Sequence, residues 1–227
     1  MPLEVIAFDA DDTLWINEPY FREAEEKFCE LLSGYMPPSQ AERELFAVEI
    51  KNLPLYGYGV KGFVLSLVET ALHITNYQIP PRAIEEILGY GKELLEKPVI
   101  LLEGVEEVLS SLYGRFRLVV ATKGDLLDQE RKLRKSGLEK YFHHIEVMSD
   151  KKEADYAKLI RHLDIRPEQF LMVGNSLKSD ILPVLSAGGH AVHVPFDVTW
   201  AHEQIDHPVE HVNFSHLNTI REILAFV

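Results

Sequence analysis

The sequence lacks the features that mark disulfide-rich, membrane and exported proteins. Only one of its 227 residues, Cys29, is a cysteine, which excludes an internal disulfide framework. No apolar run approaches the ~20 residues that a membrane-spanning helix requires. Residues 1–4 do not begin a basic and apolar signal peptide. We therefore expect a cytoplasmic protein that does not bind a membrane.

An excess of positive charge is also missing. The formal net charge is -13 at pH 7, and the acidic residues are scattered along the chain. A protein that binds the phosphates of nucleic acids needs a basic surface, so the composition argues against such a partner. A small phosphorylated molecule remains compatible with this charge, because a local lysine and a metal ion can outweigh the mean field in one pocket.

Near the N-terminus, the apolar residues 5–8 run directly into the carboxylates of Asp9, Asp11 and Asp12. Such a short apolar run is typical of a strand that is covered on both faces in a parallel sheet. Crowded carboxylates repel one another, and a divalent cation such as Mg²⁺, which prefers oxygen ligands and keeps several waters, relieves that repulsion. The alternative is that Asp11, Asp12 and Thr13 only cap the following turn or helix.

Four amphipathic segments follow this first stretch. Apolar residues recur at helical spacing in residues 19–33, 39–53, 62–74 and 81–95, and Ser39 is expected to cap the second of these helices. Because no convincing strand separates them, we expect a small helical bundle over residues 16–97.

From residue 98 onward, strands and helices alternate. We expect strands at residues 116–121, 144–148, 170–173 and 190–194, helices between them, and a closing helix over residues 215–226. This alternation predicts an α/β core with a parallel sheet and helices on both faces, built from residues 1–15 and 98–227.

Polar residues gather where these expected strands end, which is where ligands bind in parallel α/β sheets. Taken singly, such residues usually cap helices, form turns or lie on solvated surfaces. Their recurrence after four strands, the first of which ends in Asp9, predicts one functional site. The residues after the later strands are Thr122, Lys123, Lys151, Lys152, Asn175 and Asp180.

The order Asp-x-Asp-x-Thr from Asp9, a strand followed by Thr122, a lysine, and Gly-Asn-Ser-x-x-x-Asp ending at Asp180 resembles the haloacid dehalogenase superfamily. The helical insert resembles the type 1 cap of that superfamily. The resemblance covers nearly the whole chain. It implies a Rossmann-like core and a Mg²⁺-dependent phosphohydrolase that acts on a small phosphate monoester.

The resemblance also implies a role for each carboxylate near the N-terminus. Asp9 is expected to attack phosphorus and form an aspartyl-phosphate, while Asp11 protonates the leaving alcohol and later activates the hydrolytic water. Thr122 and Lys151 are expected to bind the phosphoryl oxygens, Lys123 is also expected to bind the substrate, and Lys151 stabilises the anionic Asp9.

The expected metal site consists of Asp9, Asp180, Asn175 and the carbonyl of Asp11. Many relatives have an acid where this chain has Asn175, so we expect weaker Mg²⁺ binding rather than loss of activity. The usual Lys-Pro pair is also absent at residues 151–152. The spacing to Tyr156 favours Lys151 over Lys152 as the lysine of the site.

Substrate choice is expected to come from the helical insert. Its segment 53–62 contains three glycines, and Tyr56 and Tyr58 offer stacking and hydroxyl groups, while Lys61 can meet an anion. The alternative is an ordinary interhelical loop whose aromatic residues pack. A small phosphorylated metabolite suits the short insert, and the protein is expected to be a monomer or a homodimer.

Three other functions share much of this pattern. A 2-haloacid dehalogenase uses the same nucleophile but needs no acid at position 11, because halide leaves unprotonated; Asp11 therefore favours the phosphatase. A phosphomutase fits the same residues. A receiver-like phospho-acceptor module of a signalling protein also combines acids, Thr and Lys around Mg²⁺, but it is phosphorylated on a later strand and lacks a large insert.

Overall fold

A computed structural model describes residues 2–227 of the chain. The chain divides into two compact units. The first, here called the sheet unit, comprises the segment up to Glu18 together with Val99–Val227, and the second, the helical unit, is Pro19–Pro98.

The sheet unit contains a six-stranded parallel sheet, which confirms the α/β fold. The strand order is β3-β2-β1-β4-β5-β6, the doubly wound order of a Rossmann-like fold. The strands are β1 (Val5–Phe8), β2 (Arg117–Lys123), β3 (His144–Met148), β4 (Phe170–Gly174), β5 (His190–His193) and β6 (Phe214–His216).

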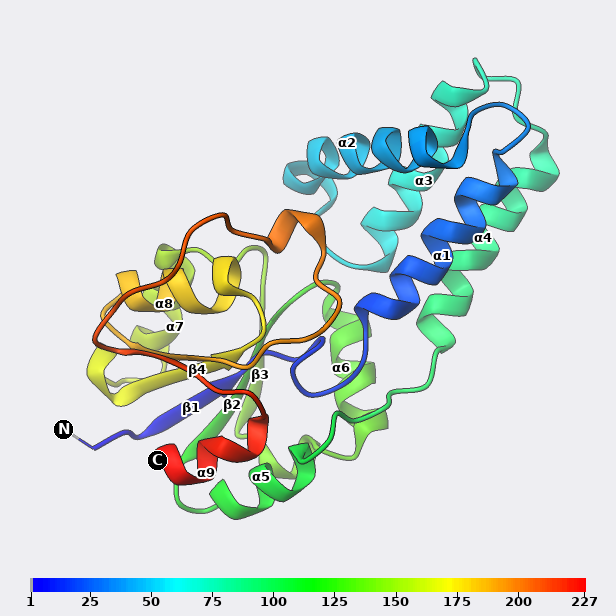
Figure 1. Ribbon diagram of the computed structural model, residues 1–227. Helices are drawn as coiled ribbons and strands as arrows, with labels where there is room; N and C mark the ends of the chain where they lie inside the picture. The colour runs from blue at the N-terminus through cyan, green and yellow to red at the C-terminus, as the bar shows by residue number, and fades with distance from the viewer. Residues whose placement is uncertain (1) are drawn as a thin grey trace. The chain divides into compact units, whose positions relative to one another are not determined.

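Strand β1 is buried on both faces, as its uninterrupted apolar sequence predicts. Ile6 and Phe8 pack on one face against α5 (Val105–Leu112), α6 (Leu126–Ser136) and α9 (Ile223–Phe226). Val5 and Ala7 pack on the other face against α7 (Glu153–His162) and α8 (Leu182–Ser186). Figure 1 shows α5 and α9 on one side of the strands and α7 and α8 on the other.

The register of the sheet brings the ends of three strands together. Phe8 lies beside Val120 of β2 and Val173 of β4. The residue after it, Asp9, donates its backbone N–H to the carbonyl of Val173 at 2.9 Å. Strand β2 continues to Lys123, two residues further than the sequence predicted, so Thr122 lies within the strand.

The helical unit is built around one apolar core, which includes Phe28, Leu32, Leu45, Leu67 and Ile87. Its helices are α1 (Glu18–Leu31), which begins at the last residue of the sheet unit, α2 (Pro38–Tyr56), α3 (Val60–Ile74) and α4 (Pro81–Glu96).

The prediction that Ser39 caps a helix is wrong. Helix α2 begins at Pro38 after Pro37, and no side chain caps it by a hydrogen bond. The fixed backbone angle of proline suits the first turn of a helix, where its missing N–H is not needed.

The C-terminal segment also differs from its prediction. Instead of one helix over residues 215–226, it forms strand β6, a 3₁₀ turn η5 (Ile220–Glu222) and the short helix α9. Phe214 pairs with Ala191 of β5, so a partner distant in sequence decides the conformation of this segment. The remaining short turns are η1 (Glu139–Tyr141), η2 (Pro167–Gln169), the π-helical η3 (Leu177–Ile181) and η4 (Ala201–Glu203).

Among residues 2–227, none of the helices combines the length and the apolar character needed to cross a membrane.

Candidate active site

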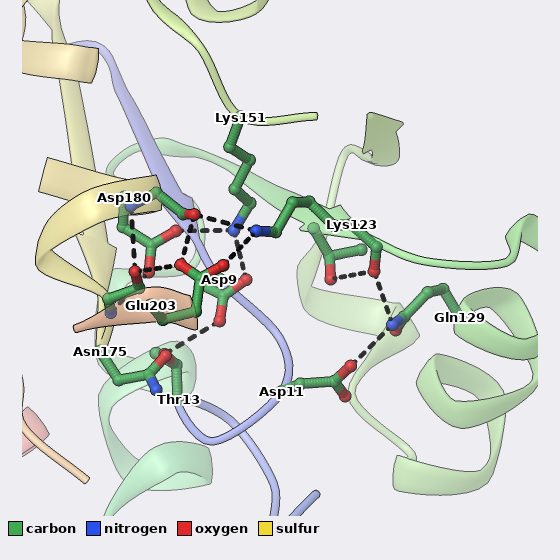
Figure 2. Close-up of polar contacts among 12 residues, drawn as sticks. Asp9, Asp11, Thr13, Lys123, Gln129, Lys151, Asn175, Asp180 and Glu203 are labelled. Atoms are coloured by element: carbon green, nitrogen blue, oxygen red, sulfur yellow. Dashed lines mark hydrogen bonds and ion pairs between the residues drawn. The ribbon is translucent and has the colours of Figure 1, made fainter. Parts of the chain in front are cut away.

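Two carboxylates and one ammonium group meet at the carboxyl end of the sheet. Lys151 follows β3 in the sequence, and its Nζ contacts Asp9 Oδ1 at the end of β1 (Figure 2). The same Nζ lies 2.6 Å from Asp180 Oδ1 in η3. Asp9 is 7% exposed, Lys151 4% and Asp180 1%. Burying two carboxylates is unfavourable unless a cation compensates them, and the ammonium of Lys151 is that cation here.

The structure distinguishes the two candidate lysines. The side chain of Lys152 is 76% exposed and forms an ion pair with Asp150 at 2.9 Å. Lys151 instead lies in the buried cluster with Asp9 and Asp180. The neighbouring Tyr156 of α7 is buried, and its hydroxyl donates to the carbonyl of Ser179 at 3.1 Å.

Burial dominates the electrostatics of this cluster. It raises the pKa of Asp9 to about 7, and the nearby charges of Asp180 and Asp11 act in the same direction, against the ammonium of Lys151. Burial alone would lower the pKa of Lys151, but Asp180 and Asp9 together raise it well above its ordinary value. An additional cation in contact with Asp9 would favour its ionised form.

Asp180 is held by the turn that follows β4. Its Oδ2 accepts a hydrogen bond from the backbone N–H of Ser176 at 2.9 Å, while its Oδ1 accepts from Lys151. A Cβ at Gly174 would overlap the carboxylate of Asp180, so only glycine admits this carboxylate at the end of β4.

Thr13 links the first acidic stretch to the end of β4. Its hydroxyl lies 3.3 Å from Asp9 Oδ2 and 3.1 Å from Asn175 Oδ1. The backbone carbonyl of Asn175 lies 2.9 Å from His193 Nε2 at the end of β5. Asp9, Asp180 and Asn175 therefore present carboxylate and amide oxygens in one place.

Carboxylate and amide oxygens are ligands that Mg²⁺ accepts in proteins. Within the described residues, no group of three or more His, Cys, Asp and Glu side chains is arranged to hold a metal ion. Mg²⁺ is usually bound through one or two carboxylates and keeps several waters, so Asp9 and Asp180 with the amide oxygen of Asn175 are an adequate donor set.

Thr122 is buried near the end of β2, with 1% of its surface exposed. Its hydroxyl lies 3.2 Å from the carbonyl of Lys123. It sits in β2, which pairs with β1, so it occupies the strand next to the one that Asp9 ends.

Lys123 forms an ion pair with Glu203, a residue that the sequence did not indicate as part of the site. Its Nζ lies 2.7 Å from Glu203 Oε1 (Figure 2). The same Nζ lies 2.9 Å from the Ser179 hydroxyl. Glu203 Oε2 also accepts from the hydroxyls of Ser176 and Ser179, each at 2.5 Å. Burial alone would raise the pKa of Glu203, but Lys123 and these hydrogen bonds lower it to about 2. Glu203 lies in η4, in the irregular segment after β5, and no motif marks it.

The carboxylate of Asp11 is turned toward α6 (Figure 2). Its Oδ1 accepts from Trp15 Nε1 at 2.7 Å and from Lys132 Nζ at 2.6 Å. Its Oδ2 accepts from Gln129 Nε2 at 2.8 Å. Gln129 and Lys132 are therefore further residues of the site that sequence reasoning missed.

Asp12 has the structural role that the capping alternative assigned to it. It adopts a left-handed backbone conformation with φ of 61°. Its carboxylate accepts from the backbone N–H groups of Asn17 at 2.8 Å and Glu18 at 3.0 Å, at the start of α1. Burial raises its pKa to about 7, with the two backbone hydrogen bonds opposing the rise.

The three candidate substrate residues of the insert lie in the helical unit. Tyr56 ends α2, and its hydroxyl donates to Glu69 Oε1 of α3 at 2.8 Å. Tyr58 lies in the short connection to α3, and Lys61 lies in the first turn of α3. Their role in substrate choice stays a prediction.

The chain is similar to known proteins over most of its length. A family model described as a haloacid dehalogenase-like hydrolase matches residues 3–188. The chain is 31% identical over 197 residues to the N-acylneuraminate-9-phosphatase of Homo sapiens, a match that covers 82% of this chain and 79% of that protein. Its match to the Mus musculus enzyme of the same name is 32% identical over 109 residues and spans only 44% of that protein.

Solved structures agree with the family match. A haloacid dehalogenase-like family hydrolase from Xanthomonas campestris is 38% identical, with a TM-score of 0.88, and the alignment covers 99% of this chain and 90% of that one. A HAD-hydrolase from Bacillus subtilis, solved bound to magnesium, shares the fold at 20% identity, with a TM-score of 0.69 over 100% of this chain and 99% of that one. The resemblance noted in the sequence is thus confirmed, and this chain belongs to the haloacid dehalogenase-like hydrolases.

Proposed function

We propose that this protein is a Mg²⁺-dependent phosphatase that hydrolyses a small phosphate monoester through an aspartyl-phosphate on Asp9. The observation that carries the proposal is the buried cluster in which Asp9 meets Lys151 and Asp180. The names of the curated relatives, which are phosphatases, support the same reaction. They also make N-acylneuraminate 9-phosphate the first substrate to assay.

In the first displacement, a carboxylate oxygen of Asp9 forms a bond to phosphorus while the ester P–O bond breaks. Asp11 gives its proton to the leaving alcohol oxygen. The ammonium of Lys151 and the hydroxyl of Thr122 offset the negative charge of the phosphoryl oxygens.

In the second displacement, water attacks phosphorus and gives a proton to Asp11. The bond between Asp9 and phosphorus breaks, so the carboxylate is regenerated and inorganic phosphate leaves. Splitting the reaction in this way replaces one very slow hydrolysis by two easier steps.

Asp9, Asp180 and Asn175 are the side chains that would hold Mg²⁺, with the carbonyl of Asp11 as a further ligand. The bound cation supplies positive charge that reduces the repulsion between the Asp9 carboxylate and the phosphate. Because Asn175 brings no charge, we expect weaker Mg²⁺ affinity than a third carboxylate would give.

The helical unit is the proposed cap, and Tyr56, Tyr58 and Lys61 are its proposed substrate-selecting residues. If they select the substrate, replacing Lys61 by Met should raise KM for an anionic substrate more than it lowers kcat. An unchanged KM would remove Lys61 from the substrate site.

The function is tested by measuring inorganic phosphate released from p-nitrophenyl phosphate and from N-acylneuraminate 9-phosphate, with Mg²⁺ and after chelation. We expect release that requires Mg²⁺ and that Asp9→Asn abolishes. Full activity of Asp9→Asn would contradict the assigned nucleophile. Transfer of the phosphoryl group to another sugar position without release of phosphate would indicate a mutase.

A further inference from the structure

We infer that Gln129 and Lys132 of α6 are positioning residues that orient Asp11 for proton transfer to the leaving alcohol. This inference rests on the proposed function, in which Asp11 is the general acid. The two residues lie 118 and 121 positions from Asp11 in the sequence, so only the fold brings them to it.

Lys132 ties together the two ends of the loop that follows β1. Its Nζ lies 2.6 Å from Asp11 Oδ1 and 3.2 Å from Asn17 Oδ1. The indole N–H of Trp15 donates to the same oxygen of Asp11 at 2.7 Å. Lys132 and Trp15 thus fix Oδ1, while Oδ2 is left to a different donor.

Gln129 supplies that donor. Its amide nitrogen lies 2.8 Å from Asp11 Oδ2 and 3.0 Å from the backbone carbonyl of Lys123. The single amide therefore connects the loop after β1 to the end of β2. Gly124 makes room for it, because a Cβ at that position would come within 3.0 Å of the Gln129 nitrogen. Gly124 also has a φ of 128°, which favours glycine.

The other half of this amide is unsatisfied. Gln129 is 2% exposed, and within the described residues its Oε1 has no hydrogen-bond donor. A buried acceptor without a donor lowers stability, and such groups are rare in native proteins. Methionine at this position would be similar in size without this defect. The structure instead keeps an amide whose two N–H groups point to Asp11 and to the end of β2.

Three donors on two oxygens leave the carboxylate of Asp11 little rotational freedom. A general acid contributes only when it is aligned with the oxygen that receives the proton. Loss of either α6 donor should therefore slow the departure of poor leaving groups selectively, because good leaving groups depart without a proton.

The test compares kcat/KM for phenyl phosphate, a poor leaving group, and p-nitrophenyl phosphate, a good one, both with Mg²⁺. For Gln129→Met and Lys132→Met we expect about 10-fold or greater loss on phenyl phosphate and a much smaller loss on p-nitrophenyl phosphate. Lys132→Arg, which restores a cationic donor, should recover part of the loss. Melting temperatures measured in parallel should show Gln129→Met folded and close to wild type.

Arg131→Met is the matched control. Arg131 lies next to Lys132 on α6 and contacts Asp128 at 3.9 Å, the same distance at which Lys132 contacts it. The Arg131→Met substitution removes one positive charge and one contact with Asp128. This variant should hydrolyse both substrates with the same kcat/KM as the wild type. In an Asp11→Asn background, Lys132→Met should add no further loss, because its effect acts through Asp11.

Equal losses on the two substrates, or additive losses with Asp11→Asn, would show a general structural role and overturn the inference. Increased activity of Lys132→Met would show that the contact holds Asp11 away from the substrate, which also overturns it. If the wild type is active and the variants have its kcat/KM on both substrates, the positioning role is refuted and the proposed function is not. Absence of phosphate release by the wild type would refute the proposed function and this role with it.

Discussion

The ammonium of Lys151 lies against the carboxylate of Asp9, which is 142 residues away in the sequence. The same ammonium contacts Asp180, so one buried cation balances two buried acids. Removing it should have a structural effect as well as a catalytic one.

Lys151→Met should lower the free energy of unfolding by about 3–5 kcal/mol, because it leaves two buried carboxylates without their partner. Under the proposed mechanism it should also reduce turnover by about 100- to 1000-fold, because the charge assigned to offset the phosphoryl oxygens is lost. Urea unfolding and phosphate release measure the two effects. Lys152→Met is the control, since that side chain is 76% exposed, and it should leave both quantities nearly unchanged.

Asn175→Asp should strengthen Mg²⁺ binding and lower the stability of the metal-free protein. A third carboxylate beside Asp9 and Asp180 adds charge for the cation but increases repulsion in its absence. We expect about a 10-fold lower Kd for Mg²⁺, equivalent to about 1.4 kcal/mol. Titration calorimetry with Mg²⁺ alone measures the expected gain in affinity. Melting temperatures in the presence of a chelator measure the expected loss of stability. Unaltered Mg²⁺ affinity would show that residue 175 does not contact the metal.

Gly174→Ala should disturb Asp180 directly. Its new Cβ would overlap the Asp180 carboxylate, so the strand end or the carboxylate must move, at a cost of about 1–3 kcal/mol. Mg²⁺ affinity and phosphatase activity should fall together. Gly34→Ala serves as the comparison, because a Cβ there meets nothing within 4 Å. If Gly174→Ala and Gly34→Ala have the same melting temperature and the same turnover, the position of Asp180 does not require glycine at residue 174.

Glu203→Gln tests the contact of Glu203 with Lys123 through its pH dependence. The pKa of Glu203 is lowered from 4.5 to about 2, so its ionised form stabilises the folded state above about pH 4.5. That contribution is lost as the pH falls from about 4.5 to about 2. At pH 7 we expect the variant to be about 3 kcal/mol less stable, because Lys123 loses a buried partner.

The difference in unfolding free energy between wild type and Glu203→Gln should shrink steadily in urea titrations at pH 5, 4 and 3. A difference that stays constant over this range would mean that the charge of Glu203 does not stabilise the fold.

Local patterns were enough to predict most elements of the fold. The apolar run 5–8 predicted a strand covered on both faces, and β1 is buried along its whole length. Strand β6 was missed because three residues of ordinary composition become a strand only through pairing with β5. The N-terminus of α2 was misplaced because a capping residue, Ser39, stands next to two prolines that fit a helix start equally well.

For the candidate site, the sequence identified residues that follow strands, because the carboxyl ends of parallel strands must meet at one edge. It did not identify their partners. Lys123 was expected to bind substrate, yet the structure pairs it with Glu203 from an irregular segment. Nothing in the spacing indicated that Asp11 would be held by α6.

The sequence by itself therefore determined the strand–helix order as far as β5, the family and the residue types at the strand ends, because periodicity and motif spacing are local properties of the chain. The tertiary structure places Lys151, which the sequence favoured, in the buried cluster and leaves Lys152 exposed, and only the tertiary structure decided that Gln129 and Lys132 hold Asp11. The physical reason is that burial and hydrogen-bond geometry depend on which segments meet in space, and these contacts join residues more than 100 positions apart.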